Sequence, residues 1–204
     1  MFALFCVFRF LHQVHPGGIR HIRADKRINE WKPPGKKKIR LAAANERQVL
    51  VALTGGELIY FELDRTGQLM DSDKRDMGSD VTSLALPPVP KGALRSKFAA
   101  VGLFDNTVRL LSLDPDEQLK QVTMQAAASV PNALILLPMS TSGSSENENL
   151  FLFVGLHNGV LTRSLVDPVE GKLTDTRKRF LGTRPIKLFS LFSSFLTFSN
   201  PYIS

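Results

Sequence analysis

The chain has 204 residues, of which 43% are hydrophobic and 22% charged, a composition that excludes a disordered or fibrous chain and favours a globular one. Its single cysteine, Cys6, excludes an internal disulfide. The net charge of +7 invites an acidic partner such as nucleic acid but does not establish one. That charge is local, because residues 1–47 carry eleven Lys and Arg against three acidic residues, a net of +8, whereas residues 48–204 carry fifteen against sixteen, a net of −1.

The chain opens with an apolar stretch at residues 1–11, which Arg9 interrupts. Eleven residues are too few to span a bilayer, which takes about 20 apolar residues. The stretch also lacks the basic start and the small-residue cleavage site of a signal peptide. Either a buried strand or a segment foreign to the domain would explain it, and we expect residues 1–13 to lie outside the repeated domain.

A cationic segment follows between residues 20 and 40 and surrounds Trp31. Clustered cations can bind phosphates, and an aromatic ring beside them can stack on a base. The same cations could equally bind an acidic protein surface. The simpler interpretation, which we favour, is a solvated edge with Trp31 packed between sheets. The candidate contacts to RNA or to an acidic partner are Arg20, Arg23, Lys26, Arg27, Trp31, Lys36, Lys37 and Lys38.

Three segments of the chain then repeat one pattern, at offsets of 50 and 53 residues. In each, an apolar run reaches a pair of turn-forming residues, a second apolar run follows, and an aspartate opens a second turn. The turn pairs supply the positive φ angles that tight hairpins need. These pairs are Gly55-Gly56, Asp105-Asn106 and Asn158-Gly159, within the segments 49–69, 98–119 and 151–173.

One further strand is expected on each side of every hairpin. Those before the hairpins are 38–44, 81–86 and 133–137, and those after them are 69–77, 119–125 and 173–180. The charged centres of 69–77 and 173–180 are typical of exposed outer strands. Four antiparallel strands in about fifty residues are typical of a β-propeller blade, and a β-sandwich is the alternative.

The sequence therefore predicts an all-β, WD40-like partial β-propeller of about three four-stranded antiparallel blades. Three blades leave an incomplete ring, since propellers typically use about 4–8, so we expect a section of a larger propeller or completion by other material. The domain is placed at 14–189, with 190–204 as a tail outside it. The blades are placed at about 38–77, 81–125 and 133–180, and Pro185–Phe189 opens another.

Catalytic and ligand signatures are missing from the sequence. It contains no Gly-x-Gly-x-x-Gly, no phosphate loop and no Gly-x-Ser-x-Gly. His12, His15 and Cys6 have the look of metal ligands, but no second cysteine pair supports a zinc site. His21 lies among arginines, where its protonation is disfavoured. We predict no enzyme activity, no catalytic residues, no cofactor and no metal site.

Long stretches of the chain resemble the family of the third subunit of the splicing factor 3b complex. The resemblance is carried by HPGGIRHIRADKRINEWKPPGKKKIRLAAANERQVLVALTGGELIYFELDRTGQL at 15–69, and continues through FAAVGLFDNTVRLLSLDPDEQL and LFVGLHNGVLTRSLVDPVEGKLTDTRKRFLGTRPIKLF. It covers residues 14–189. The wider family includes the large subunits of the damaged-DNA-binding and of the cleavage and polyadenylation factors, and this chain would correspond to part of a middle propeller.

The resemblance implies a nuclear, non-enzymatic scaffold of the U2 small nuclear ribonucleoprotein (snRNP) that makes protein–protein contacts during pre-mRNA splicing. The implied partners are other splicing factor 3b subunits, among them the HEAT-repeat subunit, and U2 snRNP components, with RNA possible and with no membrane or small-molecule substrate. The alternative is a nucleic-acid-binding module of the RNA-processing or DNA-damage-binding type that uses residues 20–40. A hydrolase-type propeller is disfavoured because no clustered nucleophile or ligand set occurs.

Overall fold

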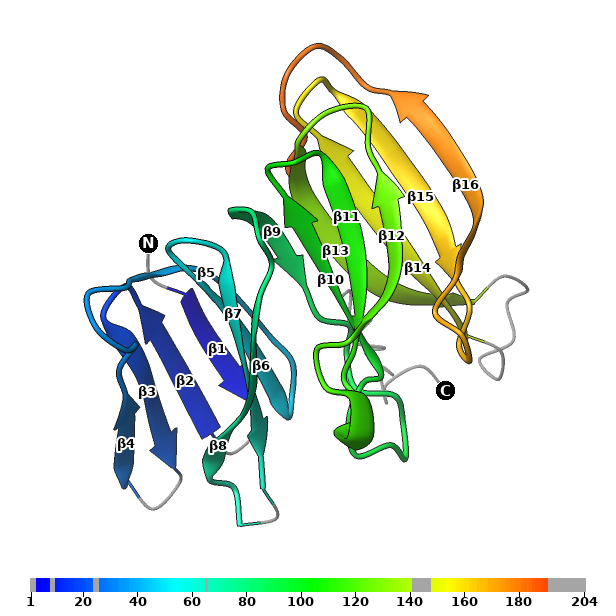
Figure 1. Ribbon diagram of the computed structural model, residues 1–204. Helices are drawn as coiled ribbons and strands as arrows, with labels where there is room; N and C mark the ends of the chain where they lie inside the picture. Colours follow the sequence, from blue (N-terminus) through cyan, green and yellow to red (C-terminus); the bar gives the residue numbers. More distant parts are fainter. Residues whose placement is uncertain (1–2, 8–9, 24–25, 65, 141–147, 191–204) are drawn as a thin grey trace, which may run out of the picture.

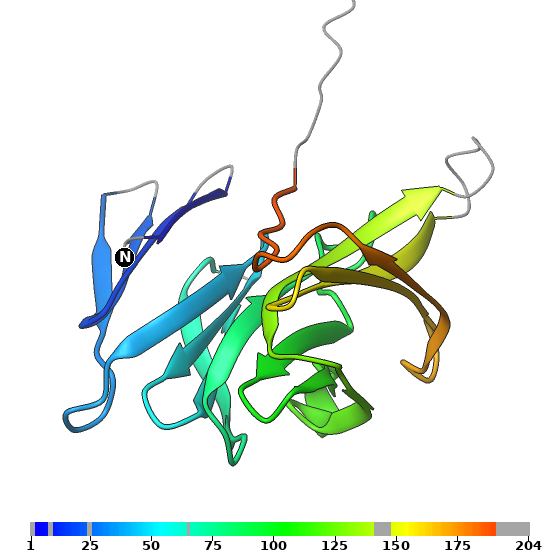
Figure 2. The same cartoon turned by 90° about the horizontal axis from the view of Figure 1, so that it is seen from above.

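The computed structural model describes residues 3–7, 10–23, 26–64, 66–140 and 148–190. Within these ranges the chain forms sixteen strands, arranged as four antiparallel sheets of four strands each, and one short 3-10 turn at Pro115–Glu117. The sheets follow one another in chain order and fan out as an open arc (Figures 1 and 2). No helix of the described residues is long and apolar enough to cross a membrane.

The strands of each sheet are consecutive in the sequence. Sheet 1 contains β1 (Ala3–Val7), β2 (Phe10–His15), β3 (Gly18–Arg23) and β4 (Ile28–Trp31). Sheet 2 contains β5 (Ile39–Ala44), β6 (Gln48–Leu53), β7 (Glu57–Leu63) and β8 (Leu69–Asp76). Sheet 3 contains β9 (Val81–Ala85), β10 (Phe98–Leu103), β11 (Thr107–Ser112) and β12 (Gln121–Ala126). Sheet 4 contains β13 (Pro131–Ser140), β14 (Glu148–Leu156), β15 (Val160–Val166) and β16 (Leu173–Phe180).

The predicted all-β class and the partial propeller are confirmed, and sheets 2, 3 and 4 correspond to the three sequence repeats. The structure adds one sheet to these, sheet 1, which β1, β2, β3 and β4 form. Strands β1 and β2 pair from Ala3↔Val14 to Val7↔Phe10, so part of the segment that the sequence placed outside the domain is paired backbone. Sheet 1 lacks the repeated turn pattern, and charged residues on β3 and β4 interrupt its apolar runs, which explains why the pattern missed it.

The hairpin turns take the backbone conformation that the sequence predicts. Gly55 and Gly56 have φ angles of +91° and +84°, Asn106 has +62° and Gly159 has +82°. At Gly56 a second constraint operates, because a Cβ atom built there would collide with the backbone carbonyl of Ser79. Glycine therefore serves this turn both by its φ angle and by the close approach of the β8–β9 connection.

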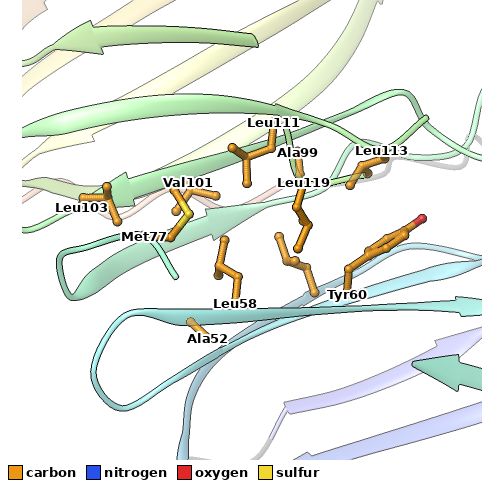
Figure 3. Packing of buried hydrophobic residues seen from close by; sticks show 11 residues of the cluster. Ala52, Leu58, Tyr60, Met77, Ala99, Val101, Leu103, Leu111, Leu113 and Leu119 are labelled. Carbon is orange, nitrogen blue, oxygen red and sulfur yellow. The ribbon is translucent and has the colours of Figure 1, made fainter. Parts of the chain in front are cut away.

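Three hydrophobic clusters fill the spaces between consecutive sheets. Between sheets 1 and 2, Val14 and Ile19 pack with Val49 and Val51. Figure 3 shows the cluster between sheets 2 and 3, where Ala52, Leu58 and Tyr60 meet Ala99, Val101, Leu103, Leu111, Leu113, Leu119 and Met77. The third cluster joins sheets 3 and 4. Strands β6 and β10 are buried along their whole length, which is why they read as continuous apolar runs and not as alternating ones.

Each sheet runs from an inner edge to an outer edge of the arc. The first strands of sheets 2, 3 and 4 contact one another at the inner edge, β5 with β9 and β9 with β13. The last strands β8 and β16 carry the predicted charged centres and are largely exposed. Residues 181–190 form no strand, although Pro185–Phe189 was expected to open a further unit, and this segment lies beside the inner edge of sheet 4 (Figure 2).

Strand β13 is longer than the strand predicted at 133–137, since it runs from Pro131 to Ser140. Its last residues pair with β14 from Pro138↔Leu150 to Ser140↔Glu148. Residues 141–147 lie outside the described part of the chain.

Candidate interaction surfaces

The basic segment at residues 20–40 is divided between the two ends of the strands. Lys38 belongs to the end where β6 turns into β7, since its N–H donates to Thr54 Oγ1 (3.3 Å) and its carbonyl accepts from Thr54 N (2.9 Å). Arg23 belongs to the end where β7 turns into β8, since its Nη2 donates to the Thr66 carbonyl (2.7 Å). We call these ends the β6–β7 rim and the β7–β8 rim (Figure 1).

The length of β7 separates the two rims. Its seven residues span roughly 20 Å at about 3.3 Å per residue. Lys36 and Lys37 lie with Lys38 on the β6–β7 rim, and Lys26 and Arg27 lie with Arg23 on the β7–β8 rim, where Arg23 N donates to the Arg27 carbonyl (3.0 Å). The eight candidate residues lie close together in the sequence, within residues 20–38, but do not form one surface.

Arg20 and Lys37 among the candidate cations have acidic partners, as does the neighbouring Lys32. Arg20 Nε lies 3.2 Å from Glu30 Oε1 on the neighbouring strand, and Lys32 Nζ approaches the second oxygen of that carboxylate at 3.8 Å. On the β6–β7 rim, Lys37 Nζ lies 2.6 Å from Glu57 Oε2. Exposed pairs of this kind contribute about 0–1 kcal/mol to stability, but they lower the net positive charge that a phosphate backbone would meet.

Trp31 packs between sheets 1 and 2. Its ring meets Phe61 of sheet 2 edge-on, with ring centroids 5.0 Å apart and planes at 78°. The side chain is half-buried against the cluster between sheets 1 and 2. This contact supports the interpretation that Trp31 joins two sheets.

His21 is buried in the interface between sheets 1 and 2. Its Nε2 lies 2.8 Å from the carbonyl oxygen of Gly67, so this nitrogen carries the proton and donates. Burial lowers the pKa of His21, with the Arg23 cation adding to the effect, although the hydrogen bond to Gly67 opposes it. The sequence predicted that the neighbouring arginines disfavour protonation of His21. The lowered pKa agrees with that prediction in direction, but burial, which the sequence did not indicate, is the larger cause.

A buried polar network joins sheets 2 and 3, and no pattern in the sequence indicates it. Gln48 is fully buried; its Nε2 donates to the Tyr60 hydroxyl (2.7 Å) and its Oε1 accepts from Ser96 N (2.9 Å) and Ser96 Oγ (2.6 Å). Asn45 Nδ2 donates to the same Gln48 oxygen (2.8 Å) and to the Pro87 carbonyl (2.8 Å). The network fastens the β9–β10 connection onto sheet 2 with its donors and acceptors paired.

A hydrogen bond of one type recurs at each of the three interfaces between sheets. A side chain from the outer half of one sheet donates to a backbone carbonyl in the last turn of the next sheet. The three bonds are His21 Nε2 to Gly67 O (2.8 Å), Arg75 Nη1 to Leu119 O (2.7 Å) and Thr123 Oγ1 to Gly171 O (3.0 Å). Their donors come from β3, β8 and β12, and each acceptor stands two residues before the strand that follows its turn.

The face of sheet 4 that points away from sheet 3 carries a hollow lined by arginines. Arg163 lies over the ring of Phe151 at 5.0 Å, and its Nε is buried without a hydrogen-bond partner among the described residues. Asp175 pairs with Arg163 (3.5 Å) and with Arg177 (3.1 Å). The residues that line the hollow are Phe153, Leu161, Arg163, Arg177 and Arg179.

The structure offers no support for metal chemistry in its described part. No group of three or more His, Cys, Asp or Glu side chains comes together there. His15 Nδ1 accepts a hydrogen bond from Gly17 N (3.2 Å), whereas the side chains of Cys6 and His12 lie outside the described part, so the trio that the sequence considered and dismissed is not tested.

Comparison with known proteins connects this geometry to a family. A family model described as the RSE1/DDB1/CPSF1 second beta-propeller matches residues 9–202. The match extends into both end segments, including 9–13 and 190–202, which the sequence pattern had placed outside the repeated domain.

Relatives with similar sequences are named as splicing proteins. The chain is 54% identical over 186 residues to Spliceosome-associated protein 130 A of Arabidopsis thaliana. It is 52% identical over 190 residues to Splicing factor 3B subunit 3 of Danio rerio and 52% identical over 182 residues to Pre-mRNA-splicing factor rse1 of Emericella nidulans. These alignments cover 88 or 89% of the chain but 15% of each relative, so the chain spans about 15% of the length of these proteins.

Proposed function

Because the chain belongs to the family of the RSE1/DDB1/CPSF1 second β-propeller, we propose that it is a non-enzymatic scaffold section of a pre-mRNA splicing factor. The names of its relatives support this role. Its task is to hold protein partners within the U2 snRNP in the nucleus. The partners proposed are other splicing factor 3b subunits, including the HEAT-repeat subunit.

The observation that favours a protein scaffold over a nucleic-acid module is the division of the basic segment. Lys36–Lys38 and Arg23–Arg27 occupy opposite rims, and Lys37 and Arg23 are engaged within the chain. Trp31 is packed against Phe61. A groove for single-stranded RNA combines a continuous positive track with exposed stacking rings, and the basic segment of this chain provides neither.

The proposal is tested with the full chain as a tagged bait in Danio rerio nuclear extract. We expect U2 small nuclear RNA and the HEAT-repeat subunit of splicing factor 3b to be enriched over an unrelated propeller bait. Tagged Splicing factor 3B subunit 3 of the same species is the positive control for the extract. Recovery of these components by the control and not by the chain would contradict the proposal that this section holds them.

A further inference from the structure

The four sheets differ in how their outermost strands are protected at the edge. A strand at the edge of a sheet exposes a row of unpaired N–H and C=O groups, with which another strand can pair. Proteins discourage such pairing with charged side chains, above all lysine, or with very short edge strands. The outermost strands here are β4, β8, β12 and β16, and β4 is short, with four residues.

The strand register shows which residues of β12 direct their backbone groups toward the open edge. Antiparallel partners alternate between pairs that exchange two hydrogen bonds and pairs whose N–H and C=O groups point away from each other. Ala127 N donates to the Asn106 carbonyl (2.7 Å), so Ala126 and, two residues before it, Met124 belong to pairs of the second kind. Their four backbone groups therefore point away from β11, at an edge to which no strand of the described chain is paired.

Lysine protects the equivalent edge position in the sheets on either side. The residue three positions after the turn pair has, as its partner on the outermost strand, Lys74 in sheet 2, Met124 in sheet 3 and Lys178 in sheet 4. Strand β12 (QVTMQA) contains no charged residue at all, in contrast to β8 (LMDSDKRD) and β16 (LTDTRKRF). The edge of sheet 3 thus lacks both the charge and the shortness that protect the other three.

The open part of this edge begins at Met124. Nearer the start of the strand, Val122 lies against Gly171 of sheet 4, and Thr123 Oγ1 donates to the Gly171 carbonyl (3.0 Å). The side chain of Met124 is 56% exposed, and Ala126 is exposed as well. An approaching strand therefore reaches the outward groups of both residues.

A lysine lies beside this edge on the side of sheet 4. Lys178 and Gln125 line one hollow between sheets 3 and 4. The acidic residue of β16, Asp175, pairs with Arg163 (3.5 Å) and Arg177 (3.1 Å) and not with Lys178. A carboxylate brought to the edge of β12 on this side would complement the charge of Lys178.

From these observations we propose that the edge of β12 binds an extended segment of a partner protein, which pairs with Met124 and Ala126 as an added strand of sheet 3. The segment places an apolar side chain against Met124 and, at a neighbouring position, a carboxylate near Lys178. One strand meets both demands, because its successive side chains point to opposite faces. Backbone hydrogen bonds supply the affinity and the two side chains supply the selectivity.

The charge near the edge favours a partner protein over a second copy of this chain. A second copy that paired through its own β12 would bring no carboxylate to Lys178, since that strand has no acidic residue. The edge belongs to the chain whatever complex contains it, so a negative U2 snRNP purification would leave this binding mode standing, and the two proposals fail independently.

The test begins with a phage-displayed library of random peptides of about ten residues, the upper end of ordinary strand length, selected on the full chain. We expect the enriched peptides to alternate apolar and polar residues and to carry a carboxylate. Met124→Lys, which copies the protection of sheets 2 and 4, is expected to weaken binding of an enriched peptide by about tenfold or more. If no peptide is enriched, the proposal is wrong.

Met70→Lys is the matched control. Met70 is also an exposed methionine of an outermost strand (47%), but its backbone groups point toward β7, because the adjacent pair Leu63↔Leu69 is of the kind whose groups point apart, with Leu63 N donating to Arg47 O (2.8 Å). We expect it to leave peptide binding unchanged. Equal losses in Met70→Lys and Met124→Lys would overturn the assignment to β12.

A second variant addresses the backbone directly, in case the added lysine disturbs folding. Ala126→Pro removes one outward N–H and leaves the donors that face β11 in place, as proline does on edge strands. It is expected to weaken peptide binding, whereas Lys178→Gln weakens only peptides that carry the carboxylate. Binding that is unchanged by Ala126→Pro would show that the peptide is held by side chains alone and would reject strand pairing.

Amide hydrogen exchange with and without the peptide gives the direct signature. We expect the amides of Met124 and Ala126 to exchange about tenfold more slowly or less when the peptide is bound, because their N–H groups become hydrogen-bonded. No slowing at these two amides would contradict the proposal. A dimer of the wild-type chain that Met124→Lys abolishes would contradict it too, because a second copy would then be the occupant.

Discussion

At the scale of single residues, His21 links the packing of sheets 1 and 2 to pH. Its side chain is 1% exposed and donates to Gly67 O. Burial lowers the pKa of His21 from its ordinary value of 6.5. Below that value the unfolded chain binds a proton that the folded chain resists, so the free energy of unfolding falls as the pH decreases.

We therefore predict that His21→Gln, which keeps an N–H donor but does not titrate, removes part of the pH dependence of stability. The wild-type chain loses stability between about pH 6.5 and the lower pKa of the folded state, by at most about 1.4 kcal/mol per pH unit from this group. Urea unfolding of both proteins at a series of pH values measures the pH dependence of the free energy of unfolding. A difference in the free energy of unfolding between wild type and variant that stays constant from about pH 7.5 to about pH 5.5 would contradict the prediction.

The polar network around Gln48 shows why some residues escape sequence analysis. An isolated glutamine in an apolar strand has no signal of its own, and Ser96, its main partner, lies 48 residues away in a connection that reads as an irregular loop. His21 was easier to interpret, because the arginines that affect it are its neighbours in the sequence. Contacts that depend on the packing of two sheets could not be predicted from one segment.

At the scale of strands and turns, the repeated hairpins were the most predictable elements. Apolar runs of strand length flank turn pairs with a strong preference for positive φ angles, so β6–β7, β10–β11 and β14–β15 appear where the pattern places them. Sheet 1 was missed because its hairpins lack that signature. Its strands are recognisable through their partners in sheet 2, as with Ile19 against Val51, and not through their own periodicity.

The turn at Gly55-Gly56 allows a prediction with an adjacent control. Both residues have positive φ angles, but a Cβ atom at Gly55 meets nothing within 4 Å, whereas one at Gly56 collides with Ser79 O. We expect Gly55→Ala to lower the free energy of unfolding by about 1 kcal/mol, because alanine is strained in the left-handed region. Gly56→Ala adds displacement of the β8–β9 connection and is expected to cost about 3 kcal/mol.

Denaturant unfolding of the two variants measures the difference. Similar losses of stability in Gly55→Ala and Gly56→Ala would show that the β8–β9 connection shifts freely. The close approach of Ser79 would then not constrain this turn.

At the scale of the whole molecule, the arc separates charges that the sequence places together. A count of lysines and arginines in residues 20–40 indicates one basic patch, yet β4 carries the chain from one rim to the other between Arg27 and Lys36. The sequence could not predict this division, because the division depends on where sheet 1 sits against sheet 2.

The division predicts the response of RNA binding to charge removal. Two triple variants are compared with the wild-type chain, one with Lys36, Lys37 and Lys38 changed to Gln and one with Arg23, Lys26 and Arg27 changed to Gln. For a protein scaffold we expect weak binding of a single-stranded 20-nucleotide RNA, reduced less than about threefold by either triple, since each rim supplies only a few phosphate contacts.

Fluorescence anisotropy between 50 and 200 mM salt, about the range over which phosphate contacts are weakened, measures this binding. A loss of tenfold or more in the lysine variant alone, with a flatter salt dependence, would instead locate an RNA site on the β6–β7 rim and favour the nucleic-acid-binding module.

The stacking of sheets in chain order has a consequence for how the arc comes apart. Each cluster joins sheets that are neighbours in sequence, so stability behaves as a sum of sheet terms and nearest-neighbour coupling terms, as in a one-dimensional array. Among the described residues, sheets 2 and 3 each pack against two sheets, whereas sheets 1 and 4 each pack against one. We therefore expect unfolding of this arc to begin at sheet 1 or sheet 4 and to move inward, whereas a closed ring would offer no such starting point.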